Sequence, residues 1–191
     1  MHKFRKYIET FANVTDKDWL IFTSFLKKRN FAKKSVFLKA GQTENYISFI
    51  EKGEVRLFLK KEEEEEKEIT LGFSFQGEFI SAYDSFLTRT PSLYQLETLS
   101  DTTLWSITYA DLQEVYKTTE IGNTIGRFFS EKLFLLKSKR EQSLLNQTPE
   151  QLYLNLFKDR PNLIKKISLK HIASYIGVTP QALSRIRKRI S

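Results

Sequence analysis

The hydrophobic pattern of this chain changes its period along the sequence, and this limits the folds that it can adopt. Over residues 33–108, apolar and polar residues alternate in short runs that are separated by Gly41, Gly53 and Gly77. Such runs predict the strands of an antiparallel sandwich or barrel. Glu62–Glu66 interrupts two of them, and five like charges predict a solvated hairpin tip. Helical spacing on both sides of this region predicts an α+β fold with an N-terminal antiparallel β jelly roll.

Two helical patterns flank the predicted jelly roll. The first covers residues 15–31, with Thr15 as its N-cap, and the second covers about residues 109–145, after a cap at Thr108. The apolar stripe of the second helix is formed by Ile121, Ile125, Phe128, Phe129, Leu133 and Leu136. A stripe of this length can pack on the barrel and on a second copy of itself. We therefore expect residues 109–145 to be a dimerisation helix.

The net positive charge of the chain lies in its last 32 residues. Residues 160–191 carry eight Lys and Arg and no Asp or Glu, whereas residues 1–159 carry 23 basic and 23 acidic side chains. A neutral body joined to a small basic module is typical of a sensor coupled to a polyanion-binding domain. Double-stranded DNA is therefore the first partner to consider.

The boundary between these parts is expected just before Thr148. Thr148 and Pro149, followed by Gln151, form a strong helix start, because threonine can cap it and glutamine can close a capping box. The sequence therefore predicts a sensor domain with a dimerisation helix over residues 1–147 and a small domain over residues 148–191.

Two short helices around Gly177 are predicted inside the basic tail. Ser168 can cap the first helix, and Thr179 with Pro180 can begin the second. A small residue four positions before the glycine and apolar residues six and nine after it are typical of a helix-turn-helix. In this chain these positions hold Ala173, Leu183 and Ile186.

The second of these helices is the predicted reading helix. Gln can pair with adenine and Arg with guanine in the major groove, so Gln181 and Arg185 are the predicted base-reading residues. Basic side chains and hydroxyls can donate hydrogen bonds to phosphate oxygens of DNA. Further predicted phosphate contacts are Lys165, Lys166 and Arg187. The predicted DNA-binding residues are Ser168, Lys170, Thr179, Pro180, Gln181, Ser184, Arg185, Lys188 and Arg189.

Three segments resemble the Crp/Fnr family of bacterial transcription regulators. Ser168–Lys188 is similar to the helix-turn-helix of that family, Tyr46–Leu57 to the glycine-turn hairpin of its cyclic-nucleotide-binding-type jelly roll, and Gly77–Ile80 to the start of its phosphate-binding cassette. The order of the parts also matches, over about residues 15–190. The resemblance implies a homodimer whose second helices enter successive major grooves of a near-palindromic site, with RNA polymerase as a further partner.

The cassette departs from the pattern of the nucleotide-binding members. The candidate pocket residues are Gly77, Glu78, Arg89, Pro91 and Ser92. The family resemblance implies an Arg-Ser or Arg-Thr pair that holds the cyclic phosphate. Counting back from the strand that contains Leu104 and Trp105 places Pro91-Ser92 at the position of this pair. Counting forward from Gly77 places Arg89-Thr90 there. Glu78 is either a ribose contact or a turn residue. Without the arginine a charge-assisted bidentate contact is missing, so we do not expect cyclic AMP to bind in the usual way.

Composition excludes several other classes. The absence of cysteine excludes disulfides, cysteine-ligated zinc, iron–sulfur clusters and thiol catalysis. His2 and His171 both lie outside residues 33–108, so we expect no cupin-type metal site, no haem and no Ser-His-Asp hydrolase. No signal peptide or 18-residue apolar run is present, which predicts a cytoplasmic protein. Because the residues that these enzyme sites need are missing, we also expect that the protein is not an enzyme. The remaining alternative is a small-molecule-binding module whose basic tail engages a protein or a membrane.

Overall fold

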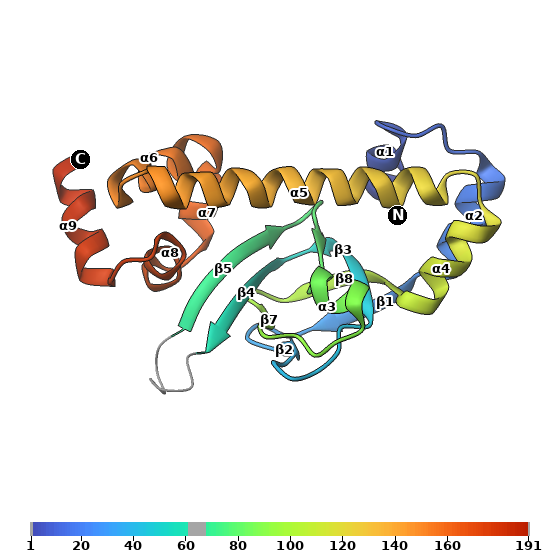
Figure 1. Ribbon diagram of the computed structural model, residues 1–191, viewed down its shortest axis with the longest axis horizontal. Helices are drawn as coiled ribbons and strands as arrows, with labels where there is room; N and C mark the ends of the chain where they lie inside the picture. Colours follow the sequence, from blue (N-terminus) through green and yellow to red (C-terminus); the bar gives the residue numbers. More distant parts are fainter. Residues whose placement is uncertain (1, 61–67, 191) are drawn as a thin grey trace. The chain divides into compact units, whose positions relative to one another are not determined.

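The computed structural model describes residues 2–60 and 68–190, with the side chains of residues 2, 3 and 162–164 excepted (Figure 1). The predicted hairpin tip Glu62–Glu66 lies outside the described residues. The chain divides into two compact units. One comprises Met1–Leu57 with Phe73–Leu133, and the other comprises Phe58–Gly72 with Phe134–Ser191.

The predicted jelly roll is confirmed. In the described part of the chain, two four-stranded sheets have the strand orders β1-β8-β3-β6 and β2-β7-β4-β5, and consecutive strands fall mostly in opposite sheets. The bounds are β1 (Lys27–Phe31), β2 (Val36–Leu38), β3 (Tyr46–Lys52), β4 (Glu54–Lys60), β5 (Glu68–Phe75), β6 (Phe79–Ile80), β7 (Gln95–Thr98) and β8 (Thr102–Thr108). Strand β3 pairs antiparallel with β8, with Phe49 opposite Trp105.

Five helices accompany the described strands up to residue 146. They are α1 (His2–Glu9), α2 (Asp16–Ser24), α3 (Tyr83–Thr88), α4 (Tyr109–Thr118) and α5 (Gly122–Asn146). The helix predicted over residues 15–31 is wrong in its second half, because residues 27–31 form β1, which pairs with β8. Tertiary pairing there overrides a helical pattern that the isolated sequence suggests. The Thr15 cap is present, since its Oγ accepts a 3.1 Å hydrogen bond from the Asp18 amide.

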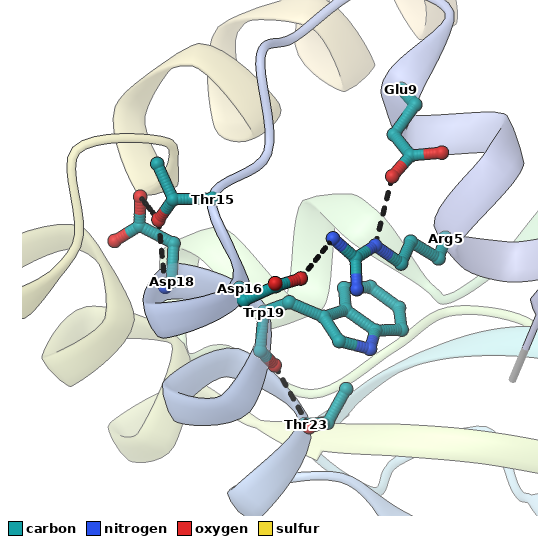
Figure 2. A network of polar contacts seen from close by, with 7 residues as sticks. All are labelled: Arg5, Glu9, Thr15, Asp16, Asp18, Trp19 and Thr23. Carbon is teal, nitrogen blue, oxygen red and sulfur yellow. Dashed lines mark hydrogen bonds and ion pairs between the residues drawn. The ribbon is translucent and has the colours of Figure 1, made fainter.

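Helix α1, which was not among the predicted elements, is joined to α2 by Arg5 (Figure 2). The Arg5 guanidinium lies 2.8 Å from Glu9 Oε1 and 2.6 Å from Asp16 Oδ1, and it covers the Trp19 ring at 5.7 Å. On its inner face, Phe4 is buried in the main aromatic core of this unit. An amphipathic helix is thus held by an ion-pair network outside and by burial inside.

The single long helix predicted over residues 109–145 is interrupted. Thr119 has an extended backbone, and its Oγ accepts a 3.0 Å hydrogen bond from the Gly122 amide, so it ends α4 and starts α5. A Cβ at Gly122 would lie 2.6 Å from the Val115 carbonyl oxygen, and one at Gly126 would lie 2.7 Å from the Tyr116 hydroxyl. Both glycines therefore allow the close approach of α5 to α4. A long helix after the jelly roll is confirmed, as α5.

The second unit contains the C-terminal helices. They are α6 (Pro149–Asp159), α7 (Pro161–Lys166), α8 (Leu169–Ile176) and α9 (Pro180–Ile190). The predicted capping box is present, because the Thr148 amide donates to Gln151 Oε1 at 2.8 Å and the Gln151 amide donates to Thr148 Oγ at 3.3 Å. The domain boundary before Thr148 stays a prediction. Within the described residues, no helix has the length and apolarity that crossing a membrane requires.

Candidate nucleic-acid interface and sensor pocket

The turn between α8 and α9 has the predicted chemistry. Ser168 Oγ accepts a 3.3 Å hydrogen bond from the His171 amide at the start of α8. Gly177 ends that helix with φ of 90°, a conformation that favours glycine. Thr179 Oγ then accepts a 3.2 Å hydrogen bond from the Ala182 amide. Both helices are capped, and the short turn between them contains a single glycine. The angle between the two helix axes is therefore restricted.

An apolar seam joins the two helices. Its buried members are Ile172, Ala173, Ile176, Leu183 and Ile186. Ala173 lies where the two backbones meet, and its carbonyl oxygen accepts hydrogen bonds from the Gly177 and Val178 amides. Because this seam uses one side of α9, the opposite side of the helix is left for another surface.

The exposed side of α9 carries the predicted reading residues. Gln181, Ser184, Arg185 and Lys188 are exposed, and their spacing places them on one face, opposite the buried Leu183 and Ile186. Together these four side chains offer an amide, a hydroxyl and two cations, and α9 contains no carboxylate. Such a surface can donate hydrogen bonds to base edges and to phosphates.

The remaining predicted DNA contacts surround that face. Ser168, Lys170, Thr179 and Pro180 are exposed at the starts of α8 and α9. Arg189 differs from the others, because its Nη2 lies 2.9 Å from Glu150 Oε2 on α6. That ion pair turns Arg189 toward its own domain, an arrangement that the sequence pattern does not reveal.

Gly77 and Glu78, the first two of the predicted pocket residues, are turn residues in this structure. Gly77 has φ of 87°, and its amide donates a 2.9 Å hydrogen bond to the Ile50 carbonyl. Glu78 Oε2 accepts a 3.0 Å hydrogen bond from the Phe75 amide. The carboxylate of Glu78 thus closes the turn between β5 and β6, which is the role of a turn residue.

Arg89 is occupied by its own domain. Its Nη1 donates to the Glu44 carbonyl at 2.8 Å and to the Phe86 carbonyl at 3.2 Å, and its Nη2 donates to Asn45 Oδ1 at 3.0 Å. The guanidinium also covers the Tyr109 ring at 4.5 Å. Arg89 has φ of 59° at the end of α3, so it combines a left-handed helix cap with a side-chain clamp.

Pro91 and Ser92 pair with the loop before β3. The Gly41 amide donates to the Ser92 carbonyl at 2.8 Å, and the Ser92 amide donates to the Gln42 carbonyl at 2.9 Å. Ser92 is buried, and its Oγ donates to the Tyr94 carbonyl at 2.8 Å. Neither Pro91 nor Ser92 supplies a charge.

Glu44, whose carbonyl contacts Arg89, is a buried acid that sequence reasoning missed. It is 5% exposed, and its carboxylate accepts hydrogen bonds from the Tyr46 amide at 2.9 Å and from the Ala82 amide, at the start of α3, at 3.5 Å. Burial raises the pKa of Glu44, although backbone amides oppose that change. An acid in a polar loop gives no sequence signal of this burial.

The predicted phosphate ligands already have partners within the protein. A cyclic phosphate requires free donors and a positive charge, yet Arg89 and Ser92 are bonded to the protein, and the Glu44 carboxylate lies at the start of α3.

On β4, the buried Arg56 has its Nη1 3.6 Å from Glu97 Oε2. Among the described residues, no group of three His, Asp or Glu side chains could hold a metal ion.

The predicted dimer stripe divides into two parts. Ile121 and Ile125 are buried in the core of their own unit, where Phe129 packs against them. Phe128 stacks on Phe11 of the same unit, with ring centroids 3.6 Å apart. Leu133 is half-buried and Leu136 is exposed. Burial of the first four residues therefore needs no second chain.

The most exposed apolar residues of α5 lie outside the predicted stripe. Phe134 is 71%, Leu135 66% and Leu145 81% exposed, all in the second half of the helix. Exposed apolar residues repeating along one helix are typical of a helix–helix interface. Helical spacing could have identified this exposed face. The predicted stripe instead consisted mainly of residues that pack within their own unit.

The jelly-roll part of the chain is similar in sequence to a known domain family. Residues 28–119 match the cyclic nucleotide-binding domain family. No protein with a curated description matches the chain in sequence.

The fold is shared with solved regulators. The c-di-GMP-responsive global regulator CLP of Xanthomonas campestris has a TM-score of 0.70 at 16% identity, over 92% of this chain and 91% of CLP. FixK2 of Bradyrhizobium japonicum has a TM-score of 0.70 at 12% identity, over 86% and 84%. A Eubacterium rectale regulator assigned to the Crp/Fnr family has a TM-score of 0.68 at 15% identity, over 92% and 83%. The resemblance to Crp/Fnr regulators is thus confirmed as a shared fold.

Proposed function

Because residues 28–119 belong to the cyclic nucleotide-binding domain family and the fold is that of Crp/Fnr regulators, we propose that this protein is a sequence-specific DNA-binding transcription regulator. The observation that carries the proposal is the exposed face of α9, where Gln181, Ser184, Arg185 and Lys188 stand opposite the buried seam. Gln181 and Arg185 read base edges. Ser168, Lys170, Thr179, Pro180, Ser184 and Lys188 contact the DNA backbone, and Arg189 joins them by leaving its ion pair with Glu150.

The regulator acts as a homodimer on a near-palindromic site. The apolar residues Phe134, Leu135 and Leu145 of α5 support a helix–helix interface, since water otherwise surrounds them. Two copies related by a two-fold axis present two α9 helices to major grooves about one helical turn, roughly 34 Å, apart. RNA polymerase is the further partner that such a regulator engages.

The β-roll responds to an effector other than a cyclic nucleotide held by the usual phosphate contacts. Two contacts support this: the Arg89 donors are already bonded within the protein, and the inward Glu44 carboxylate repels an anion at the start of α3. The effector is a small molecule of another class, and the protein uses no iron–sulfur cluster or haem.

A second candidate function is a binding module whose basic tail engages an anionic membrane or a protein. Fluorescence anisotropy with the purified protein separates the two. We expect binding to labelled duplex DNA and no comparable binding to phosphatidylserine vesicles at the same ionic strength. Two results together would favour the second candidate. The protein would bind the vesicles, and its affinity for duplex DNA would be the same for every DNA sequence.

A further inference from the structure

Ser174, on the first helix of the helix-turn-helix, joins that helix to a β-strand more than one hundred residues earlier. Its Oγ donates a 2.6 Å hydrogen bond to the Glu68 carbonyl and accepts a 2.8 Å hydrogen bond from the Thr70 amide. Both backbone groups belong to β5, and these residues lie in the same compact unit as α8.

The position of β5 explains why a hydroxyl suits this contact. In the described part of the chain, β5 lies at the edge of its sheet, after β4. An edge strand presents the amides and carbonyls of alternate residues to whatever lies beside it. Glu68 and Thr70 are two residues apart, so their backbone groups point to the same side, where the Glu68 carbonyl lies next to the Thr70 amide. A serine hydroxyl can donate and accept at once, so it pairs with both groups.

The next residue of α8 is held from another side. Arg140 on α5 donates a hydrogen bond to the Tyr175 carbonyl, and its guanidinium covers the Tyr175 ring at 3.8 Å. Arg140 is half-buried, and this burial lowers its pKa. The last turn of α8 is therefore fixed to β5 by Ser174 and to α5 by Arg140.

We propose that Ser174 is a positioning residue for DNA recognition, which fixes the helix-turn-helix against the edge of β5 while Arg140 fixes it to α5. The inference rests on the proposed function. Since the buried seam and Gly177 join α8 rigidly to α9, a shift of α8 carries the reading face with it. In a dimer formed by α5, the Ser174 and Arg140 contacts together set the separation of the two reading faces. Loss of either therefore impairs binding to paired half-sites more than contact with a single half-site.

The test compares Ser174→Ala with the wild-type chain and with Ser143→Ala, a control serine on α5. Hydrogen exchange of the Thr70 amide, followed by NMR, reports the contact without DNA. We expect exchange at Thr70 to be about tenfold faster in Ser174→Ala and unchanged in Ser143→Ala. Affinity is then measured on duplexes with two half-sites and with one. We expect Ser174→Ala to bind the paired site about three- to tenfold more weakly and the single half-site with unchanged affinity.

Each outcome decides the proposal. Unchanged exchange at Thr70 would overturn the contact itself. Faster exchange with unchanged binding to the paired site, or equal weakening on both duplexes, would overturn the positioning role. Arg140→Gln, which removes the second restraint on α8, is expected to weaken the paired site in the same selective way. If no duplex binds any variant, the proposed function fails, whereas the exchange measurement still reports whether Ser174 holds β5.

Discussion

Arg89 Nη1 donates a 2.8 Å hydrogen bond to the backbone carbonyl of Glu44, which joins the end of α3 to the loop before β3. The same guanidinium covers the Tyr109 ring at the start of α4. The residue that sequence counting placed as a possible phosphate ligand thus connects three segments of its own domain. Its role in this structure is that of a clamp.

Arg89→Ala is expected to destabilise the β-roll. The substitution removes three hydrogen bonds and the contact that covers the Tyr109 ring, at a partly exposed site. We therefore expect a loss of about 1–2 kcal/mol in the free energy of unfolding. Urea unfolding measures it. A variant as stable as the wild type, which instead loses affinity for a small-molecule effector, would restore Arg89 as a ligand residue.

Glu44 is expected to give the stability a particular pH dependence. Burial raises the pKa of Glu44, so between the ordinary carboxyl value and the raised value the folded state holds a proton that the unfolded chain has lost. The contribution is fully present below the ordinary value and is lost as the pH rises through the folded value. Urea unfolding of wild type and Glu44→Gln, from about pH 4 to pH 8, should show wild type losing stability relative to the variant. A relative gain would mean that the backbone amides dominate and the pKa is lowered.

The exposed half of α5 is expected to form the dimer interface. Leu135→Asp places a charge on a surface residue, so we expect a dimer at least about tenfold weaker, with monomer stability unchanged. Ile125→Asp is the contrasting variant, because it buries a charge in the core and should cost about 3–5 kcal/mol of stability. Light scattering and urea unfolding measure the two effects. A Leu135→Asp dimer as tight as wild type would place the interface elsewhere.

Arg185 and Lys165 are expected to affect DNA binding differently. Arg185→Ala should lose about 1–3 kcal/mol on the preferred site and relax discrimination at one base pair. Lys165→Ala should weaken all sequences alike and reduce the slope of log affinity against log salt by about one unit. Both side chains are exposed, so neither change should alter folding. Equal loss on random DNA would make Arg185 a phosphate contact.

Local signals predicted the capped elements well. Thr108, Thr148, Ser168 and Thr179 each accept the expected amide hydrogen bond, because capping depends only on residues three positions apart. Gly177 has the predicted positive φ for the same reason. The reading face of α9 follows directly from helical spacing once Leu183 and Ile186 are buried.

The features that the sequence did not reveal depend on distant partners. Residues 27–31 became a strand because β8 lies beside them, and Glu44 was buried by the start of α3. The stripe through Ile121 and Ile125 was correctly identified as apolar, but periodicity cannot say whether its own domain or a second chain covers it. The contact of Ser174 with β5 likewise leaves no local pattern.

Selection of binding sites from a random duplex DNA pool with the purified protein tests the central claim most directly. We expect enrichment of a two-fold-symmetric sequence whose half-sites lie about one helical turn apart. The enriched positions should lose their preference when Gln181 and Arg185 are replaced by alanine. A pool that stays random with the wild-type chain, together with equal affinity for unrelated duplexes, would contradict sequence-specific recognition by α9.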